Sequence, residues 1–219
     1  AQFEVFSSIQ RSLSDTTSNV GLVLTAAGTV NLADELGARA VGFILSGGDD
    51  TATTGSGDDT IYGGDGNDVV NAGIGNDLLL GEGDNDTLNG GAGNDVIEGD
   101  TGDDTLNGGA GDDVIWGDDT GAEPGNDIIR GEAGNDIIYD AVGVLSIDGG
   151  ADNDRLYVGG SGQTGTVNGG TGIDIFTAYN GSSDITGLTL SNLEILSGGG
   201  ARHRHCGAVR RLQLDSGFR

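Results

Sequence analysis

Residues 63–98 read GGDGNDVVN-AGIGNDLLL-GEGDNDTLN-GGAGNDVIE, which is a series of units nine residues long. In each unit an aspartate occupies the sixth position, an asparagine precedes it, and an apolar residue follows two positions later. The same phase extends in both directions, so aspartates recur at this spacing from Asp50 to Asp113. Random variation in an acidic chain would not hold several positions in phase over so many units. A sustained fixed period predicts a solenoid built from stacked repeats.

The period is disturbed beyond Trp116. The unit 117–130 carries an insertion, and the unit 140–148 has Leu145 at the position where the others have aspartate. Regular units then return, so the repeat region is predicted to span residues 45–177. The aspartates predicted to lie at the repeated position are Asp50, Asp59, Asp68, Asp77, Asp86, Asp95, Asp104, Asp113, Asp127, Asp136 and Asp154.

Each unit is interpreted as a glycine-rich turn followed by a short strand. Glycine permits positive φ and close backbone approach in the turn. The last three residues, such as Thr60, Ile61 and Tyr62, would point outward, inward and outward around one apolar side chain. Two units would form a coil with strands on opposite sides, and stacked coils would pair strands about 4.8 Å apart. The predicted fold is all-β: a parallel β-roll, that is, a right-handed two-sheet parallel β-helix solenoid.

The composition is strongly acidic, and this excludes some classes of function. The 219 residues include 35 Asp and Glu against 9 Lys and Arg, for a formal net charge of −26. Such a chain repels phosphate, so nucleic-acid binding is not expected. No apolar run approaches the roughly 18–20 residues of a membrane span. The charge and the low aromatic content also match disorder, which leaves an unfolded chain or a fold whose acids are neutralised by cations.

Stacked turns would bring the carboxylates of every second unit together. Residues 45–157 contain most of the acids but only two arginines, Arg130 and Arg155. Calcium accepts about six to eight oxygen ligands in loose geometry, including backbone carbonyls, whereas magnesium demands stricter geometry. Zinc prefers nitrogen and sulfur, and residues 1–202 contain no His or Cys. Calcium is therefore the predicted cofactor of a calcium-loaded roll, at about eight ions per chain.

Units such as 63–71 and 90–98 resemble the RTX, or hemolysin-type, calcium-binding nonapeptide repeat. The resemblance covers roughly residues 45–177. It implies that each calcium ion lies between stacked turns and is bound by the sixth-position aspartates of both. Second- and fourth-position carbonyls of one turn and first- and third-position carbonyls of the other would complete the ligand set.

The resemblance assigns sites residue by residue. The implied sites include Gly55, Gly57 and Asp59 with Ala72, Ile74 and Asp77; Gly64, Gly66 and Asp68 with Gly81, Gly83 and Asp86; and Gly91, Gly93 and Asp95 with Gly108, Ala110 and Asp113. Other turn residues assigned to the metal sites are Gly48, Gly63, Asp65, Gly73, Gly75, Gly90, Ala92, Gly99, Thr101, Gly102, Gly109, Gly111, Gly131, Ala133, Gly134, Gly149 and Ala151.

The chain departs from the repeat pattern in a few turns. Asp84 and Asp152 replace the fourth-position glycine, and the insertion alters the turn at 117–127. Leu145 is expected to abolish the calcium site of its unit, because it supplies no carboxylate.

The flanks differ from the repeat region. Residues 1–19 are predicted to be an N-terminal lead or cap, and 20–44 to be irregular capping coils, because the ends of a solenoid need covering. Residues 178–197 are predicted to be capping strands. The basic tail 198–219 is predicted to be disordered or foreign to the natural protein.

No motif of a known catalytic centre is present, so the chain is not expected to be an enzyme. The family resemblance implies a bacterial protein that is secreted or held at the cell surface, exported by the type I secretion machinery, and folded by external calcium. The predicted function is a calcium-binding module that supports secretion and stability of a larger parent protein.

Two alternative functions remain open at this point. One is an adhesive or polysaccharide-binding surface module, for which Trp116 and Tyr139 would face outward and stack on a sugar. The other is the non-catalytic C-terminal part of a secreted hydrolase or epimerase.

Overall fold

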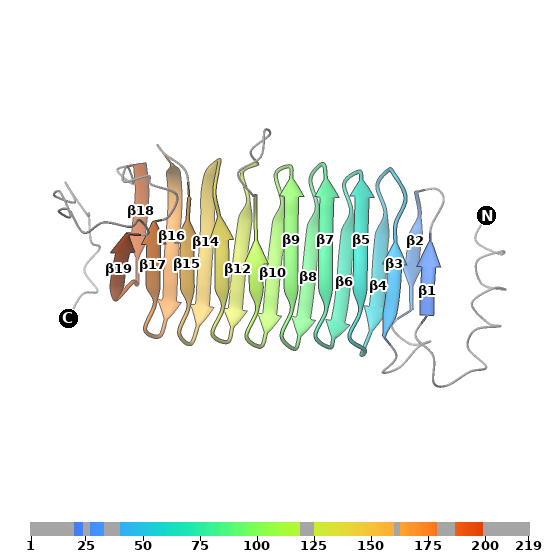
Figure 1. Ribbon diagram of the computed structural model, residues 1–219, viewed down its shortest axis with the longest axis horizontal. Helices are drawn as coiled ribbons and strands as arrows, with labels where there is room; N and C mark the ends of the chain where they lie inside the picture. The colour runs from blue at the N-terminus through green and yellow to red at the C-terminus, as the bar shows by residue number, and fades with distance from the viewer. Residues whose placement is uncertain are drawn as a thin grey trace.

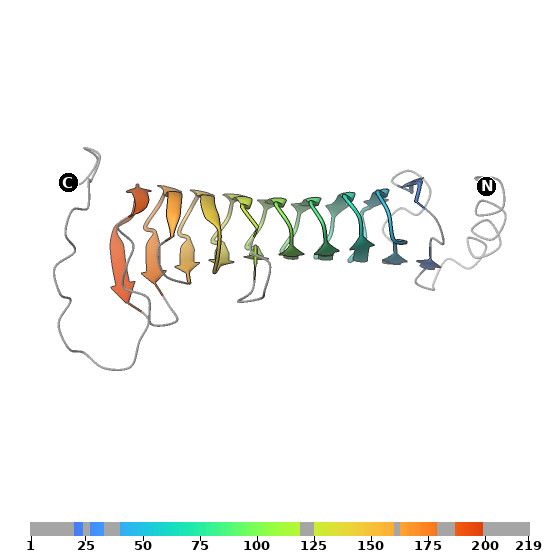
Figure 2. The ribbon, with the colours of Figure 1, turned by 90° about the horizontal axis from the view of Figure 1, so that it is seen from above.

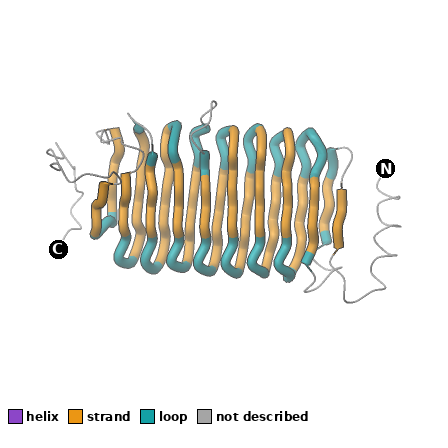
Figure 3. Tube along the Cα trace, viewed as in Figure 1, coloured by secondary structure: helices purple, strands orange, loops and turns teal. Residues whose placement is uncertain are grey.

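The computed structural model describes residues 20–23, 27–32, 40–118, 125–159, 163–178 and 187–198. These residues form two parallel sheets, one of 10 strands and one of 9. Successive strands alternate between the sheets, so that the chain coils along the long axis of the molecule (Figure 1). Seen from above, the two sheets face each other (Figure 2), and turns join them at both edges (Figure 3). The predicted all-β, two-sheet parallel solenoid is confirmed.

The odd-numbered strands form one sheet, called the odd sheet, and the even-numbered strands form the other, called the even sheet. The odd sheet contains β1 (Val20–Val23), β3 (Val41–Ile44), β5 (Thr60–Asp65), β7 (Leu78–Gly83), β9 (Val96–Thr101), β11 (Val114–Trp116), β13 (Ile137–Asp140), β15 (Arg155–Val158), β17 (Ile175–Ala178) and β19 (Ile195–Gly198). The even sheet contains β2 (Thr29–Asn31), β4 (Thr51–Gly55), β6 (Val69–Ile74), β8 (Thr87–Ala92), β10 (Thr105–Ala110), β12 (Ile128–Ala133), β14 (Val144–Ala151), β16 (Thr164–Thr171) and β18 (Gly187–Ser191).

The strands pair in register, so that each residue lies opposite the residue at the same position of the repeat in the neighbouring coil. Leu106 of β10 lies opposite Leu88 of β8 on one side and opposite Ile129 of β12 on the other. The second pair spans the insertion in the unit 117–130, yet it joins equivalent positions of the repeat. The extra residues therefore leave the stacking of the coils unchanged.

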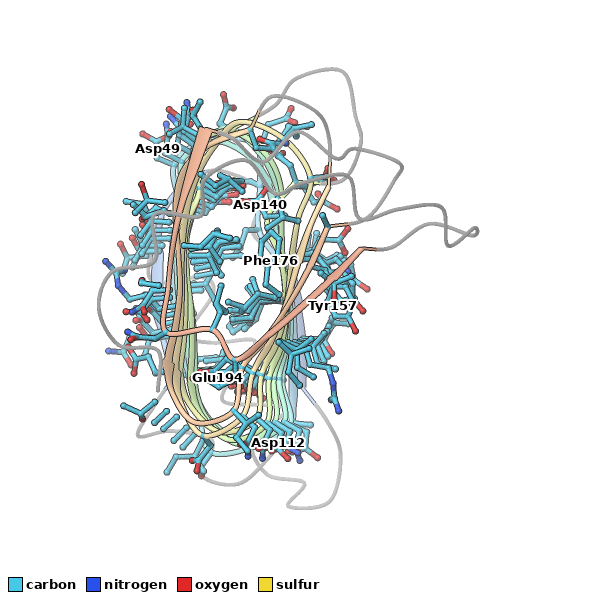
Figure 4. All side chains as sticks on the ribbon, turned by 90° about the vertical axis from the view of Figure 1, so that its left-hand side faces the viewer. Asp49, Asp112, Asp140, Tyr157, Phe176 and Glu194 are labelled. Carbon is cyan, nitrogen blue, oxygen red and sulfur yellow. The ribbon has the colours of Figure 1, made fainter. Side chains whose placement is uncertain are left out.

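The core is a column of apolar side chains between the sheets. The eighth residue of each unit points inward and is buried, as the alternation in the sequence predicts. Viewed along the axis of the roll, Phe176 lies between the two sheets (Figure 4). Burial of each such side chain contributes about 1.5–3 kcal/mol. The column contains Ala52, Ile61, Val70, Leu79, Leu88, Ile97, Leu106, Ile115, Ile129, Ile138, Ile147, Leu156 and Phe176.

Some turn glycines are required because the coils approach each other there. Gly93 has a φ of 130°, and a Cβ at this position would overlap the carbonyl oxygen of Gly75 in the adjacent coil. Gly83 is different: its φ is not positive, and a Cβ there would meet its nearest atom, Asp65 Oδ1, at 3.6 Å. The two glycines therefore provide a matched pair for mutagenesis.

Gly93→Ala is expected to lower the free energy of unfolding by more than about 2 kcal/mol, because the left-handed backbone alone costs about 1–2 kcal/mol and the overlap adds to it. Gly83→Ala is expected to change it by less than about 1 kcal/mol. Urea unfolding in saturating calcium, followed by far-UV circular dichroism, measures both. Equal effects of the two substitutions would contradict the close approach of the coils at Gly93.

The described part of 20–44 is more regular than the sequence predicts. Strands β1, β2 and β3 extend the two sheets, and Phe43 pairs with Ile61 and is completely buried in the apolar column. At the other end, β18 and β19 continue the sheets beyond the last repeat. The predictions for residues 1–19 and for the tail beyond Gly198 lie outside the described residues.

None of the described residues form a helix with the length and apolarity needed to cross a membrane.

Candidate metal centre

The sixth-position aspartates form two rows that run along opposite edges of the roll. Asp49 and Asp112, which directly precede members of the two rows, mark these edges in Figure 4. The first ladder consists of Asp50, Asp68, Asp86, Asp104 and Asp127. The second ladder consists of Asp59, Asp77, Asp95, Asp113, Asp136, Asp154 and Asp174.

Within each ladder one carboxylate oxygen is used to join neighbouring coils. The backbone N–H of Asp59 donates to Asp77 Oδ1 at 2.7 Å, and the N–H of Asp86 donates to Asp104 Oδ1 at 2.7 Å. The same bond recurs from coil to coil. It fixes the orientation of each carboxylate and leaves the second oxygen, Oδ2, pointing into the turn.

The second oxygen is buried and has no hydrogen-bond partner in nearly every member of the ladders. Asp50 is the exception, because its Oδ2 accepts hydrogen bonds from the N–H and the hydroxyl of Ser46. A buried carboxylate oxygen without a partner is strongly unfavourable, so these repeated oxygens fit the role of cation ligands. The unpartnered atoms are Oδ2 of Asp59, Asp68, Asp77, Asp86, Asp95, Asp104, Asp113, Asp127, Asp136, Asp154 and Asp174.

Glycine at the first position keeps open a space in front of this oxygen. An ideal Cβ on Gly63 would lie 2.7 Å from Asp68 Oδ2 and 2.6 Å from the carbonyl oxygen of Gly81 in the next coil. Gly81, Gly108 and Gly149 border the same kind of space, each beside the Oδ2 of its own unit and a carbonyl oxygen of the next coil. The atoms that converge there are carboxylate and carbonyl oxygens. This donor set fits calcium.

The cation would be held by carboxylates in pairs rather than by a larger acidic cluster. Across the described ranges, no group of three or more His, Cys, Asp or Glu side chains is arranged to hold a metal ion. The backbone carbonyls must therefore supply much of the ligand set. This requirement agrees with the glycine-rich turns, which bring carbonyl oxygens close to the carboxylates.

Burial perturbs the ionisation of the ladders when no cation is present. Burial, together with the charges of Asp104 and Asp68, raises the pKa of Asp86 to about 8, although the hydrogen bond from the Asp68 amide acts in the opposite direction. Burial likewise raises the pKa of Asp77 and Asp113 to about 7. The fold therefore disfavours bare carboxylates inside the turns at neutral pH.

Two exposed acids that directly precede ladder aspartates, Asp112 and Asp49, behave in the opposite way. Asp112 is exposed, and its Oδ1 accepts hydrogen bonds from the N–H and side-chain amide of Asn135, which lower its pKa. Asp49 accepts the equivalent bonds from Asn67 with the same effect on its pKa. These outer acids are stable as anions without a metal ion, so the adjacent acids in the sequence have different roles.

The structure places the sequence-assigned residues of the implied sites in adjacent coils. In the site that contains Asp68 and Asp86, the Asp68 N–H donates to Asp86 Oδ1 at 2.8 Å, and the Gly81 carbonyl faces Asp68 Oδ2. The site that contains Asp59 and Asp77 is less open. There Thr54 replaces the first-position glycine, and its hydroxyl donates to the carbonyl oxygen of Ala72 at 2.7 Å.

Sequence reasoning missed two buried polar residues at the end of the first ladder. Asp140 is completely buried, and both of its carboxylate oxygens lack hydrogen-bond partners. Gln163 donates from Nε2 to the carbonyl oxygens of Ala141 and Gly159, at 2.6 and 2.9 Å. The sequence did contain a sign of Asp140. It is an aspartate at the first position of the unit 140–148, in which Leu145 replaces the sixth-position aspartate. Beyond this unit, the side-chain amide of Gln163 occupies the hydrogen-bonding sites of these two carbonyls.

The outward aromatic residues form a stack. The Trp116 and Tyr139 rings lie 5.6 Å apart and nearly parallel, and the Tyr139 and Tyr157 rings lie 4.6 Å apart. Tyr157 projects from the outer face of the odd sheet in Figure 4. Because Tyr139 has a ring on each side, its faces are occupied within the stack, which does not favour a role in sugar binding.

The fold and the acidic ladders define a class of protein: a parallel β-roll whose turns bring buried carboxylate oxygens close to backbone carbonyl oxygens. The model of the RTX calcium-binding nonapeptide repeat matches the chain in four copies, at residues 45–79, 80–115, 122–140 and 146–162. The chain therefore contains RTX calcium-binding nonapeptide repeats, and these repeats form the β-roll described above. Such repeats are typical of secreted bacterial proteins. No curated protein matches the chain.

Proposed function

We propose that this chain is a non-catalytic calcium-binding module of a secreted bacterial protein, and that it folds when it binds on the order of eight calcium ions. The observation that carries the proposal is the repeated, buried and unpartnered Oδ2 atom of the ladder aspartates. A family of calcium-binding repeats and a donor set made only of oxygen atoms support the same metal.

The chain's own residues prepare the sites in three ways. Hydrogen bonds from the preceding coil hold each carboxylate in one orientation, as between Asp95 N–H and Asp113 Oδ1 at 2.7 Å. First-position glycines such as Gly108 leave room beside Asp113 Oδ2. The apolar column holds consecutive turns in register. When bound, calcium supplies positive charge that neutralises the paired carboxylates.

We propose that calcium-dependent folding also assists export of the chain from the cell. In a compartment with little calcium, repulsion among the acids favours an expanded chain, and only the folded form offers complete sites. External calcium then stabilises the folded form by binding to it selectively. We propose that this switch assists type I secretion and the stability of a larger parent protein, as in the secreted proteins that typically carry such repeats.

A catalytic role is not proposed, because the adjacent acids do not face a common substrate position. Asp113 is buried in its ladder, whereas its neighbour Asp112 is exposed and hydrogen-bonded to Asn135. This division suits one metal ligand and one turn-stabilising group. It does not suit a pair of carboxylates acting together as acid and base.

Neighbouring Asp113 and Asp112 provide the test of calcium binding. Equilibrium dialysis at millimolar calcium should show on the order of eight ions bound per chain. Asp113→Asn removes a carboxylate shared by two successive coil pairs, so we expect one or two fewer ions. Asp112→Asn removes the same charge from an exposed position, and its count should equal that of the unchanged chain. If the unchanged chain binds no calcium, the proposed function is wrong.

A further inference from the structure

The turn formed by the coils 117–130 and 140–148 contains polar groups that the repeat pattern does not explain. Leu145 occupies the sixth position and is buried, so this coil presents no ladder carboxylate to Asp127. Asp127 nevertheless retains the properties of a ladder member. Its Oδ1 accepts the N–H of Asp104 at 2.9 Å, and its Oδ2 is buried without a partner.

Asp140 brings a carboxylate to the same turn from a different unit position. It is the last residue of β13, and its main chain lies beside Gly117 and Val158 in the neighbouring coils. In Figure 4 its side chain lies inside the roll, near the edge marked by Asp49. Asp140 is 0 % exposed, and neither of its carboxylate oxygens has a hydrogen-bond partner.

Gly117 shows that the two carboxylates enter one space. An ideal Cβ on Gly117 would lie 2.6 Å from Asp127 Oδ2 and 3.3 Å from the carboxyl carbon of Asp140. At the equivalent Gly63, the same point is bordered by the unit's own Oδ2 and by a carbonyl oxygen of the next coil. The Asp140 carboxylate therefore lies where the other coils present oxygen ligands.

Among the described residues, no cationic group lies where it would neutralise this pair. The cationic side chains of the described ranges are Arg130 and Arg155, and both are exposed. The backbone amides of Val142 and Ala141 lie near the Asp140 carboxylate, but neither forms a hydrogen bond with it. Nearby Asp118 is itself an acid, and its Oδ2 accepts the N–H of Gly125.

We infer that Asp127 and Asp140 form an additional calcium site, in which Asp140 supplies the carboxylate that Leu145 lacks. The inference rests on the proposed calcium-binding function. It reverses the expectation that Leu145 abolishes the site of its unit: the site is kept by moving the carboxylate from the sixth position to the first. Asp140 occupies the first position of its unit, where the repeat supplies a backbone carbonyl and not a carboxylate, so this ligand does not follow from the repeat pattern.

The test is the number of calcium ions bound by the full chain in equilibrium dialysis. Asp140→Asn preserves the shape of the side chain and is expected to lose one ion while the others remain. The control is Asp148→Asn in the same coil, because Asp148 is exposed and accepts a hydrogen bond from Asn168. Its count should not change. If Asp140→Asn binds as many ions as the unchanged chain, the inference is overturned, although calcium binding itself stands.

A double variant gives a decision that does not depend on the folding of Asp140→Asn. Asp140→Gly combined with Leu145→Asp restores the regular repeat in this unit. If Asp140 is a ligand now, the double variant exchanges one carboxylate for another, and its calcium count is equal to that of the unchanged chain or lower. A count higher by one ion would show that the unchanged chain has no site here. If the unchanged chain binds no calcium at all, the proposed function fails and not this inference alone.

Discussion

Chelation of calcium is expected to abolish the β-roll. Without cations, the ladders would place rows of carboxylates inside the turns, and the Oδ2 atoms of Asp77, Asp86, Asp95 and their equivalents would be buried without partners. The core cannot offset this penalty easily, because most coils bury only one large apolar side chain in each sheet. The folded form is therefore expected to exist mainly when calcium occupies the turns.

Far-UV circular dichroism measures this effect directly. At neutral pH in excess chelator, the spectrum should be that of a mainly unfolded chain, and added calcium should restore the β signal cooperatively. Magnesium at equal concentration is the control, and it should restore little, because it demands stricter geometry and keeps its water ligands. A complete β spectrum in chelator, unaffected by added calcium, would contradict the central proposal.

Acidification in the absence of calcium is expected to have the opposite effect and restore β structure. Burial raises the pKa of Asp68 and Asp104 to about 6, of Asp127 and Asp154 to about 7, and of Asp86 to about 8. A carboxyl whose pKa is higher in the folded chain than in the unfolded chain favours folding when it is protonated. Its contribution is lost as the pH rises toward and through the folded-state pKa.

The expected result is a reversal of pH dependence by calcium. In chelator, the β signal should be greater at about pH 5 than at about pH 8, because the ladder carboxyls pass from neutral to charged in this window. In limiting calcium, the signal should instead fall toward low pH, because protons compete with the metal for the same oxygens. Circular dichroism across this range, with and without calcium, tests both arms. A signal in chelator that increases with pH would show that burial of the ladders does not control folding.

The repeat pattern predicted what the coils have in common. The eighth-position residues form the apolar column, and the sixth-position aspartates form the ladders, because each depends only on its position in the unit and on the same position in the next coil. The structure adds that Asp112 is exposed whereas Asp113 is buried.

Features that occur in a single unit were not predictable in the same way. The capture of the Ala72 carbonyl by Thr54 and the convergence of Asp140 on Asp127 depend on how one altered coil packs against a regular one. The hydrogen bonds of Gln163 likewise depend on two carbonyls from different coils. The repeat pattern contains no information about these contacts, because each is made by a residue that departs from the pattern in a single unit.

The hydrogen bonds between coils run in both directions along the roll. In both ladders the amide of an earlier aspartate donates to the carboxylate of a later one, whereas at the preceding position the amide of a later residue donates to an earlier side chain, as from Asn135 N–H to Asp112 Oδ1. At the C-terminal end of the second ladder, Glu194 completes the turn by accepting the Asp174 N–H at 2.7 Å, and it lies near that edge in Figure 4. Each inner coil is therefore tied to both of its neighbours through side-chain acceptors, and the last coil of the second ladder needs an acceptor from outside the repeat.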